Sequence, residues 1–310
     1  MTRSRTDVKR NSLVIVLHRI PFDRDHDLAR LLDLVAVARM ARGSDFLHPG
    51  GLQWLLRRLV NPDFEVSLWA EDDVAIAYSV VDAEYAMLGL APEHAKRRLE
   101  LLATVEDRMR SAGRASIEIS VWDHDRLLRE AIAERGYVAS GTSGPELVYG
   151  APKPPSAPPL PPGFAFVPFE PSIDDAYVEM HRDAWSTIAP SPYRRELHDA
   201  VTAMPDFRRD MVPIVAAPDG SLAAYCIGWL DPRTNSVEIE PLGTRPRFRA
   251  LGLAHAVVAE VIRRGYEHGA TSVLVWTSLS GSHANLPAFE LYRTSGMKDT
   301  RTLREYRRAF

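Results

Sequence analysis

Apolar residues recur along the chain with the spacings of strands and helices, beginning in the first half. Strands are expected at residues 13–20, 64–70, 74–81, 85–90 and 116–121, with one or two closing strands between 137 and 149. Helices are expected at 25–41, 50–60, 92–111 and 123–135, the last with Asp123 as its N-cap. The first half therefore alternates strands with amphipathic helices.

The same order of elements returns in the second half. Strands are expected at 164–169, 212–216, 222–230, 237–242 and 272–277, with closing strands in 297–310. Helices are expected at 172–186, 193–204, 252–268 and 285–295. Because both halves follow the order β-α-α-β-β-β-α-β-α-β, the chain is predicted to be a weak tandem repeat.

A proline-rich segment, residues 151–162, lies between the two repeats. Seven of its twelve residues are proline, which cannot pair in a sheet or continue a helix and which favours an extended, semi-rigid spacer. We therefore predict an N-terminal domain at 1–150, a linker at 151–162 and a C-terminal domain at 163–310.

The composition is that of an ordinary soluble protein, with 45% hydrophobic and 25% charged residues in a chain of 310. The net charge of −3 gives no reason to expect nucleic acid or an anionic membrane surface as a partner. Cys226 is the only cysteine and stands in an apolar run, so we interpret it as a core residue and exclude a disulfide within the chain. No apolar run is long enough to span a membrane, and a cytoplasmic location is expected.

The stretch from Glu240 to Ala254 joins a predicted strand to a predicted helix through a basic loop. Residues 249–254 read Arg-Ala-Leu-Gly-Leu-Ala, in which Gly252 leaves room for a ligand and the neighbouring arginines supply positive potential: Arg245, Arg247 and Arg249. A helix start of this kind suits a pyrophosphate. The alternative is a helix that merely begins with glycine, flanked by solvated arginines.

Two motifs in the second half resemble the GCN5-related N-acetyltransferase (GNAT) superfamily. Residues 249–254 resemble its Arg/Gln-x-x-Gly-x-Gly/Ala signature, and residues 285–297, from Asn285 to Met297, resemble its Asn-x-x-Ala-x-x-Leu-Tyr-x-x-x-Gly-Phe stretch. The tandem arrangement further resembles mycothiol-synthase-like acetyltransferases. The resemblance covers residues 164–310 well and implies an α/β (α+β) fold of two tandem GNAT-like domains, each a mostly antiparallel mixed sheet flanked by helices.

The resemblance also implies roles for individual residues. Acetyl-CoA would be the co-substrate, held by one set of residues: Leu242, Arg249, Ala250, Leu251, Gly252, Leu253, Ala254 and Asn285. Tyr292 would protonate the leaving thiolate, and Glu240, or less favourably Glu238 on the same strand face, would take a proton from the amine. The alternatives are local: Asn285 as a helix N-cap, Tyr292 as a packing residue and Glu240 as a carboxylate that fixes the backbone.

The first half departs from this pattern. Between Gly89 and Gly113 it has no glycine, so side chains fill the place of the pyrophosphate loop, and the expected counterpart of Asn285 is Asp123. We therefore predict a degenerate first domain that shapes the acceptor cleft or buries a partner surface. On the first helix of the second half, where the family puts acceptor specificity, solvated or packing roles are favoured for His181, Asp183 and Trp185.

These observations predict an acetyl-CoA-dependent N-acetyltransferase that acts on the primary amine of a small molecule, with a single site in the C-terminal domain. A non-catalytic acyl-CoA sensor or scaffold and a protein-lysine acetyltransferase remain alternatives. No metal is expected, because the ten histidines form no cluster with ligand spacing. The protein is expected to be a monomer or homodimer without nucleic-acid or membrane partners.

Overall fold

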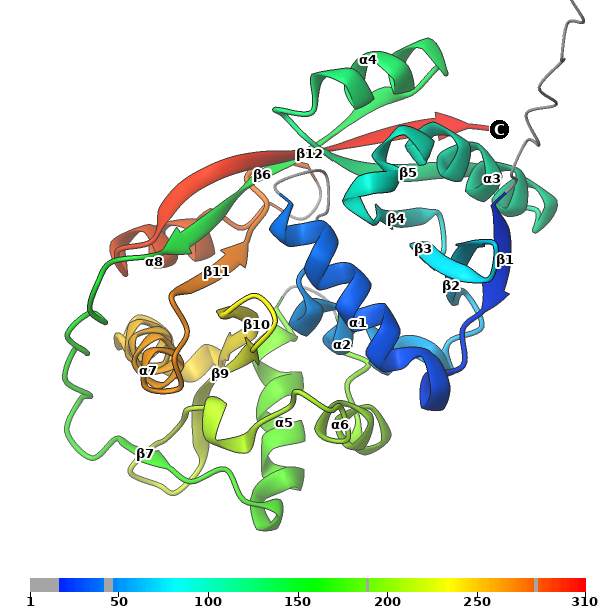
Figure 1. Ribbon diagram of the computed structural model, residues 1–310. Helices are drawn as coiled ribbons and strands as arrows, with labels where there is room; N and C mark the ends of the chain where they lie inside the picture. Colours follow the sequence, from blue (N-terminus) through cyan, green and yellow to red (C-terminus); the bar gives the residue numbers. More distant parts are fainter. Residues whose placement is uncertain (1–16, 42–46, 188–189, 282–283) are drawn as a thin grey trace, which may run out of the picture.

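The computed structural model describes residues 17–41, 47–187, 190–281 and 284–310. Its strands form one sheet in the order β1-β2-β3-β4-β5-β12-β6-β11-β10-β9-β8-β7 (Figure 1). Most neighbours are antiparallel, and the parallel pairs are β4 with β5 and β10 with β11. The fold class predicted from the sequence is therefore confirmed, with the added finding that the sheets of the two halves are continuous.

The first half contains the predicted elements with small shifts at their ends. Its strands are β1 (His18–Pro21), β2 (Phe64–Glu71), β3 (Val74–Asp82), β4 (Tyr85–Leu90), β5 (Ser116–Trp122) and β6 (Val138–Tyr149). Its helices are α1 (Arg24–Met40), α2 (Pro49–Leu56), α3 (Arg98–Ser111) and α4 (Arg126–Glu134), with 3-10 turns η1 (Arg57–Val60) and η2 (Pro92–Arg97). Residues 13–16 of the first predicted strand lie outside the described residues.

The second half repeats this order. Its strands are β7 (Ala165–Val167), β8 (Ile214–Ala216), β9 (Leu222–Asp231), β10 (Ser236–Thr244), β11 (Ser272–Trp276) and β12 (Lys298–Ala309). Its helices are α5 (Asp174–Trp185), α6 (Arg195–Thr202), α7 (Leu253–Glu267) and α8 (Leu286–Thr294), with 3-10 turns η3 (Pro171–Ile173), η4 (Arg209–Met211) and η5 (Pro246–Phe248). The proline-rich residues 151–162 contain neither helix nor strand.

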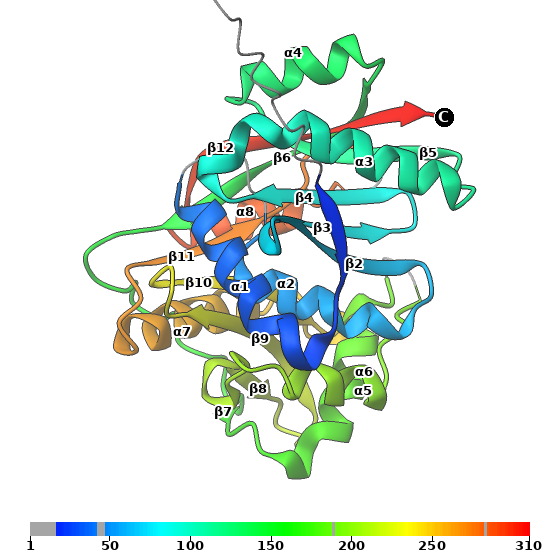
Figure 2. The ribbon, with the colours of Figure 1, turned by 45° about the vertical axis from the view of Figure 1, so that its right-hand side comes forward.

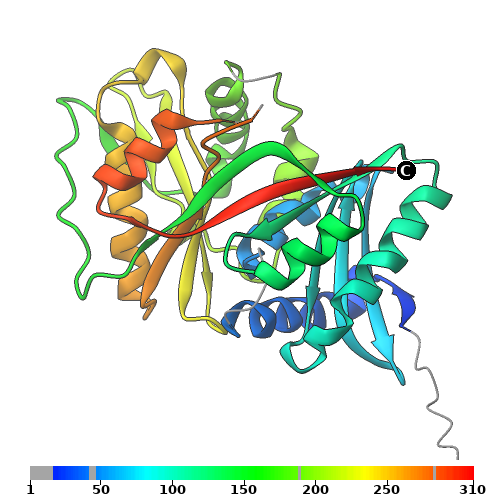
Figure 3. The ribbon, with the colours of Figure 1, turned by 90° about the horizontal axis from the view of Figure 1, so that it is seen from above.

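The halves exchange their last strands. The final strand of the first half, β6, pairs with β11 of the second, with Val273 opposite Tyr149. The final strand of the chain, β12, lies between β6 and β5, with Leu303 opposite Trp122. Figure 3 shows β6 and β12 running side by side across both halves. The last strand of each half is hydrogen-bonded to strands of the other half. The two halves therefore cannot separate without breaking backbone hydrogen bonds.

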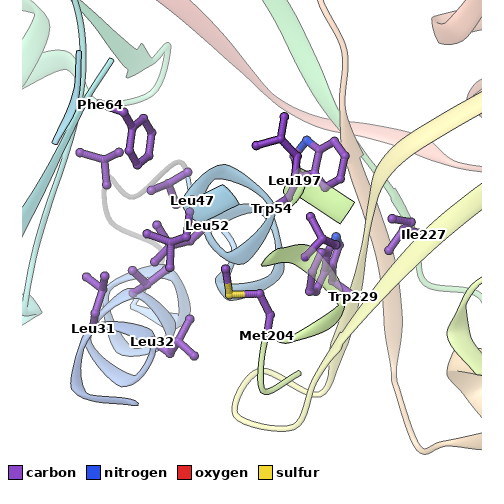
Figure 4. Close-up of a cluster of buried hydrophobic side chains, with 14 of the residues drawn as sticks. Leu31, Leu32, Leu47, Leu52, Trp54, Phe64, Leu197, Met204, Ile227 and Trp229 are labelled. Atoms are coloured by element: carbon purple, nitrogen blue, oxygen red, sulfur yellow. The ribbon is translucent and has the colours of Figure 1, made fainter. Parts of the chain in front are cut away.

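A shared hydrophobic core lies where α1 and α2 meet the second half (Figures 2 and 4). Trp54 on α2 belongs to the same buried cluster as Leu197 on α6 and Trp229 on β9. At Gly50 a Cβ atom would lie 2.1 Å from Cβ of Trp229, so only glycine lets α2 approach β9 this closely. The N-terminal half is thereby packed directly against one face of the C-terminal sheet.

Candidate active site

The C-terminal sheet opens between two parallel strands, β10 and β11. They pair only from Ser236 to Glu238, opposite Ser272 to Leu274, and β10 then continues to Thr244 without β11. On its other edge β10 carries a register shift against β9 between Ile239 and Leu242. Such a bulge breaks the ladder and re-aims the residues within it, which here are Glu240 and Pro241.

The opening leads to a cavity of about 610 Å³ between the start of α7 and the start of α8. Its lining includes all but one of the residues predicted to bind the co-substrate: Leu242, Arg249, Ala250, Gly252, Leu253, Ala254 and Asn285. The exception, Leu251, lies in the same loop with 43% of its surface exposed. One cavity thus brings together two motifs that are more than thirty residues apart in the sequence.

The start of α7 is left open by its backbone conformation. Gly252 is the N-cap residue with φ of +79°, in the left-handed region that favours glycine, and no side chain caps the helix. A Cβ atom at this position would meet nothing within 4 Å. Glycine is therefore required here by the backbone and not by crowding, and the first amides of α7 remain available to an anionic ligand.

The basic loop is less free than its sequence suggests. Arg245 forms ion pairs with Asp183 at 2.6 Å and Glu179 at 2.8 Å, and Arg247 lies 3.3 Å from Asp219. Neighbouring carboxylates therefore offset part of the positive potential predicted for Arg245 and Arg247, which sequence spacing does not reveal.

Arg249 is the third arginine and has a different environment. Its guanidinium donates to the carbonyl oxygen of Ala184 at 2.8 Å and to Oγ1 of Thr187 at 3.0 Å. Within the described part of the chain it forms no ion pair, so its charge is the one that the cavity retains. These contacts also fix the loop to the end of α5.

Asn285 caps α8, as the local alternative predicted. Its Oδ1 accepts a hydrogen bond from the amide of Ala288 at 3.2 Å, and Pro287 occupies the first turn. The residue also lines the cavity, so the capping role and the ligand role are geometrically compatible. Asn285 thus holds its helix start at the cavity wall.

Tyr292 lies two turns further along α8 and is 6% exposed. It packs in the core cluster that contains Cys226, and burial, reinforced by Cys226 and Glu240, raises the pKa of its hydroxyl well above the ordinary value. A phenol in this environment remains protonated at neutral pH. Cys226 itself is fully buried, as predicted for a core residue.

The two glutamates of β10 have different surroundings. Glu238 accepts a hydrogen bond from the amide of Gly51 at 2.6 Å and lies 3.4 Å from Nδ1 of His48, both in the first half. Burial raises the pKa of Glu238 to about 8. Among the residues that the structure describes, the Glu240 side chain has no such partner, and burial, opposed by the charge of Arg57, raises its pKa to about 7. Glu238 is therefore tied to the interface between the halves, and Glu240 is the carboxylate available for proton transfer at neutral pH.

The equivalent opening in the first half is closed. Strands β4 and β5 pair in parallel only at Tyr85 and Ala86, but the cavity beyond measures about 30 Å³. Arg98 at the start of α3 forms a 2.7 Å ion pair with Asp125 at the start of α4, and both helix starts are thereby bridged. The prediction that Asp123 caps α4 is wrong, because Asp125 is the N-cap and Asp123 instead pairs with Arg304.

The sequence predicted that the first half shapes the acceptor cleft, but it did not indicate which of its residues lie there. Arg57 follows α2 and stacks on Trp54, whose ring centroid lies 5.8 Å from that of Tyr193 in the second half. The only sequence signal is the spacing of Trp54 and Arg57, three residues apart on one helical face, and it does not indicate which surface that face meets.

Helix α5 carries the three residues for which solvated or packing roles were favoured from the sequence: His181, Asp183 and Trp185. His181 is buried in an aromatic stack, and Trp185 lines the cavity while its indole donates to the hydroxyl of Tyr225 at 3.0 Å. Asp183 forms an ion pair with Arg245.

Among the described residues no group of histidine, cysteine, aspartate and glutamate could hold a metal ion, and no helix has the length and apolar character needed to cross a membrane.

Residues 174–297 match the family model described as the acetyltransferase (GNAT) family. A search of curated proteins gave no match. Among solved structures, a GCN5-related N-acetyltransferase from Sphaerobacter thermophilus is similar, with a TM-score of 0.61 and 20% identity over 94% of this chain and 95% of that one.

Two further structures cover both halves. A tandem GNAT protein from the clavulanic acid biosynthesis pathway has a TM-score of 0.65 and 14% identity over 94% of this chain and 98% of its own. An acetyltransferase of the GNAT family from Colwellia psychrerythraea has a TM-score of 0.58 and 12% identity over 93% and 99%. At these identities the likeness shows the fold alone, and that fold is a tandem one.

Proposed function

We propose that this protein moves an acetyl group from acetyl-CoA to the primary amine of a small molecule, because residues 174–297 match the model of the acetyltransferase (GNAT) family, whose fold supports acyl transfer from coenzyme A. The reaction takes place at a single site in the C-terminal half. The observation that carries the proposal is the cavity at the β10–β11 opening, which has two helix starts on its walls and Glu240 in the adjoining bulge.

The residues of the cavity suit the co-substrate. The uncapped amides at the start of α7 would bind the pyrophosphate, with the retained charge of Arg249 nearby. Beyond Glu238, β10 no longer pairs with β11 on that edge. The backbone around Leu242 is therefore available to form hydrogen bonds with the amides of the pantetheine arm. Asn285, at the opposite wall, would orient that arm.

Two residues would carry the proton transfers, Glu240 as the acceptor and Tyr292 as the donor. Near neutral pH a large share of Glu240 is ionised, and it accepts a proton from the substrate ammonium, directly or through water. The free amine attacks the thioester carbonyl, and the tetrahedral adduct expels the thiolate of coenzyme A. Tyr292, which stays protonated, would donate its proton to that thiolate and would be reprotonated by the second proton that the attacking nitrogen loses as it becomes an amide.

The first half supports a small acceptor. Helix α2 packs against β9 and β10, so the side of β10 that carries Glu238 is covered by Gly51 and His48. A protein lysine would need an open groove at this face. A low-molecular-weight amine would need only to reach Glu240, which retains partial solvent exposure.

The test is a thiol-release assay with acetyl-CoA and a panel of amines, followed by mass spectrometry of the products. We expect at least one amine to gain about 42 Da, the net change when an acetyl group replaces a hydrogen, in a reaction that needs enzyme and acetyl-CoA together. Tight binding of acetyl-CoA with no turnover of any amine would instead favour the sensor function.

A further inference from the structure

The bulge that carries Glu240 receives little support from the sheet around it. Two residues of β10, Glu240 and Pro241, stand opposite the single residue Ile227 of β9, so the regular ladder is interrupted there. On the other edge, β10 pairs with β11 only as far as Glu238. A backbone segment without regular ladder partners on either side needs other contacts to hold one conformation. The position of the Glu240 carboxylate therefore depends on the contacts that fix this segment.

Trp229, a buried residue of β9 that stands opposite Glu238 in the ladder, makes such a contact. Its indole N–H donates a hydrogen bond of 2.6 Å to the backbone carbonyl oxygen of Glu240. A planar indole has only two rotatable side-chain bonds, so once it is packed the direction of its N–H group is fixed. The bond thus ties the bulge to β9 at the residue that is proposed as the base.

The N-terminal half fixes the indole in turn (Figure 4). Gly50 on α2 lies so close that a Cβ atom there would come within 2.1 Å of Cβ and 2.7 Å of Cγ of Trp229. The ring of Phe207 meets the indole edge-on, with 5.8 Å between ring centroids and an interplanar angle of 67°. In such dense packing the indole cannot adopt another rotamer unless its neighbours move. A chain of contacts therefore runs from the backbone of α2 through Trp229 to the backbone of Glu240.

We infer that Trp229 is a positioning residue for the base, and that α2 of the N-terminal half holds it in place. Trp229 is not among the residues that line the co-substrate cavity, so its effect on the reaction would pass through Glu240. A shift of about 1 Å in a reacting group can cost about 100-fold in rate, which makes one backbone hydrogen bond important here. The inference rests on the proposed function and gives the N-terminal half a role in the chemical step.

The test compares Trp229→Phe with the matched control Trp69→Phe. Trp69 is buried to a similar degree in the first half, where its indole N–H donates to Oγ of Ser79 at 2.9 Å. Both changes remove one indole N–H and leave an aromatic ring, so both should lower Tm. Only Trp229→Phe should lower kcat, by about 10- to 100-fold, with acetyl-CoA affinity unchanged within about twofold. Added to Glu240→Gln, it should lower kcat by less than about twofold further, because the base through which it acts is gone.

The pKa of the Glu240 carboxyl is a second readout, and it needs no turnover. It is followed by NMR of protein labelled with carbon-13 at the glutamate carboxyl groups, with Glu240→Gln to assign the signal. Burial raises this pKa to about 7 in the wild type, and a bulge released from Trp229 should expose the carboxylate and lower the pKa. The titratable groups within electrostatic range of Glu240 remain in both tryptophan variants: Arg57, Glu238, Tyr225, Cys226 and Tyr292.

If Trp229→Phe does not fold, benzothienylalanine is incorporated in place of Trp229, because it has the shape of tryptophan with sulfur instead of the indole N–H. The inference is overturned if the pKa of Glu240 is the same in the wild type and the Trp229 variant, or if the effects of the Trp229 variant and Glu240→Gln on kcat are additive. Equal losses of kcat in the Trp229 variant and Trp69→Phe would also overturn it. A wild type that acetylates no amine would reject the proposed function, and the pKa measurement would still decide the positioning role.

Discussion

The two halves of this protein open their sheets at the same place, between β4 and β5 in one and between β10 and β11 in the other. In the second half the two helices beyond the opening have Gly252 and Asn285 as their N-cap residues, and the starts of these helices enclose a cavity of about 610 Å³. In the first half Arg98 and Asp125 stand at the helix starts, where they form an ion pair and leave a cavity of about 30 Å³. One scaffold thus holds either a ligand cavity or an internal ion pair.

The difference lies in a few side chains at the helix starts and not in the backbone topology. Asp125 and Asn285 both cap their helices by accepting a hydrogen bond from the amide three residues on. The aspartate additionally attracts an arginine, and a carboxylate at this position would repel a phosphate. The first half instead packs α2 against the sheet of the second, with the amide of Gly51 donating to Glu238 on β10. Four substitutions test this comparison.

The largest effect is expected for Gly252→Glu. It places a carboxylate at the open start of α7 and a side chain on a backbone with φ of +79°, and acetyl-CoA affinity should fall by at least about 100-fold. Calorimetry measures the affinity. Gly269→Glu is the matched control, since Gly269 ends the same helix with φ of +88° and also has free space around it. Equal affinities in the two variants would refute the pyrophosphate assignment.

Glu240→Gln should lower kcat/KM about 100-fold or more, because a neutral amide cannot accept the amine proton. In the wild type, kcat/KM should fall as pH drops below about 7, where Glu240 becomes protonated, and this limb of the profile should be missing in the variant. Glu238→Gln is the control: its amide oxygen can still accept from Gly51, so activity should stay within about fivefold. A stronger loss in the control would make Glu238 the base.

Tyr292→Phe should lower kcat by about 10- to 100-fold with little change in acetyl-CoA affinity, because the ring still packs while the thiolate loses its proton donor. Single-turnover kinetics and calorimetry separate the two quantities. Tyr266→Phe removes a hydroxyl that bonds the carbonyl of Ala151, away from the cavity, and should not affect kcat. Unchanged turnover in Tyr292→Phe would mean that water protonates the thiolate.

The smallest effect is expected for Arg98→Ala in the first half. Turnover should stay within about twofold, and loss of the partly buried ion pair should lower Tm by about 1–3 °C. The wild type should bind one acetyl-CoA per chain by calorimetry. A stoichiometry of two, or coenzyme A bound between β4 and β5 in a soaked crystal, would contradict the degenerate state of this half.

Much of the fold could be predicted because it depends on local patterns. The order of helices and strands followed from periodicity, Gly252 was expected at a helix start because it leaves room for a ligand, and the capping by Asn285 followed from its short polar side chain. Asp125 was missed in favour of Asp123 because two aspartates, two residues apart, precede α4, and the capping geometry alone distinguishes them.

The sequence by itself determined the elements, the proline-rich break between them and the residues around the C-terminal cavity. Only the tertiary structure decided the exchange of β6 and β12, the pairing of Arg245 and Arg247 with carboxylates, and the packing of α2 against β9. The physical reason is the separation along the chain between the residues that interact. Periodicity and capping depend on neighbours within a few residues, whereas strand partners, ion pairs and desolvation depend on groups brought together from distant parts of the chain.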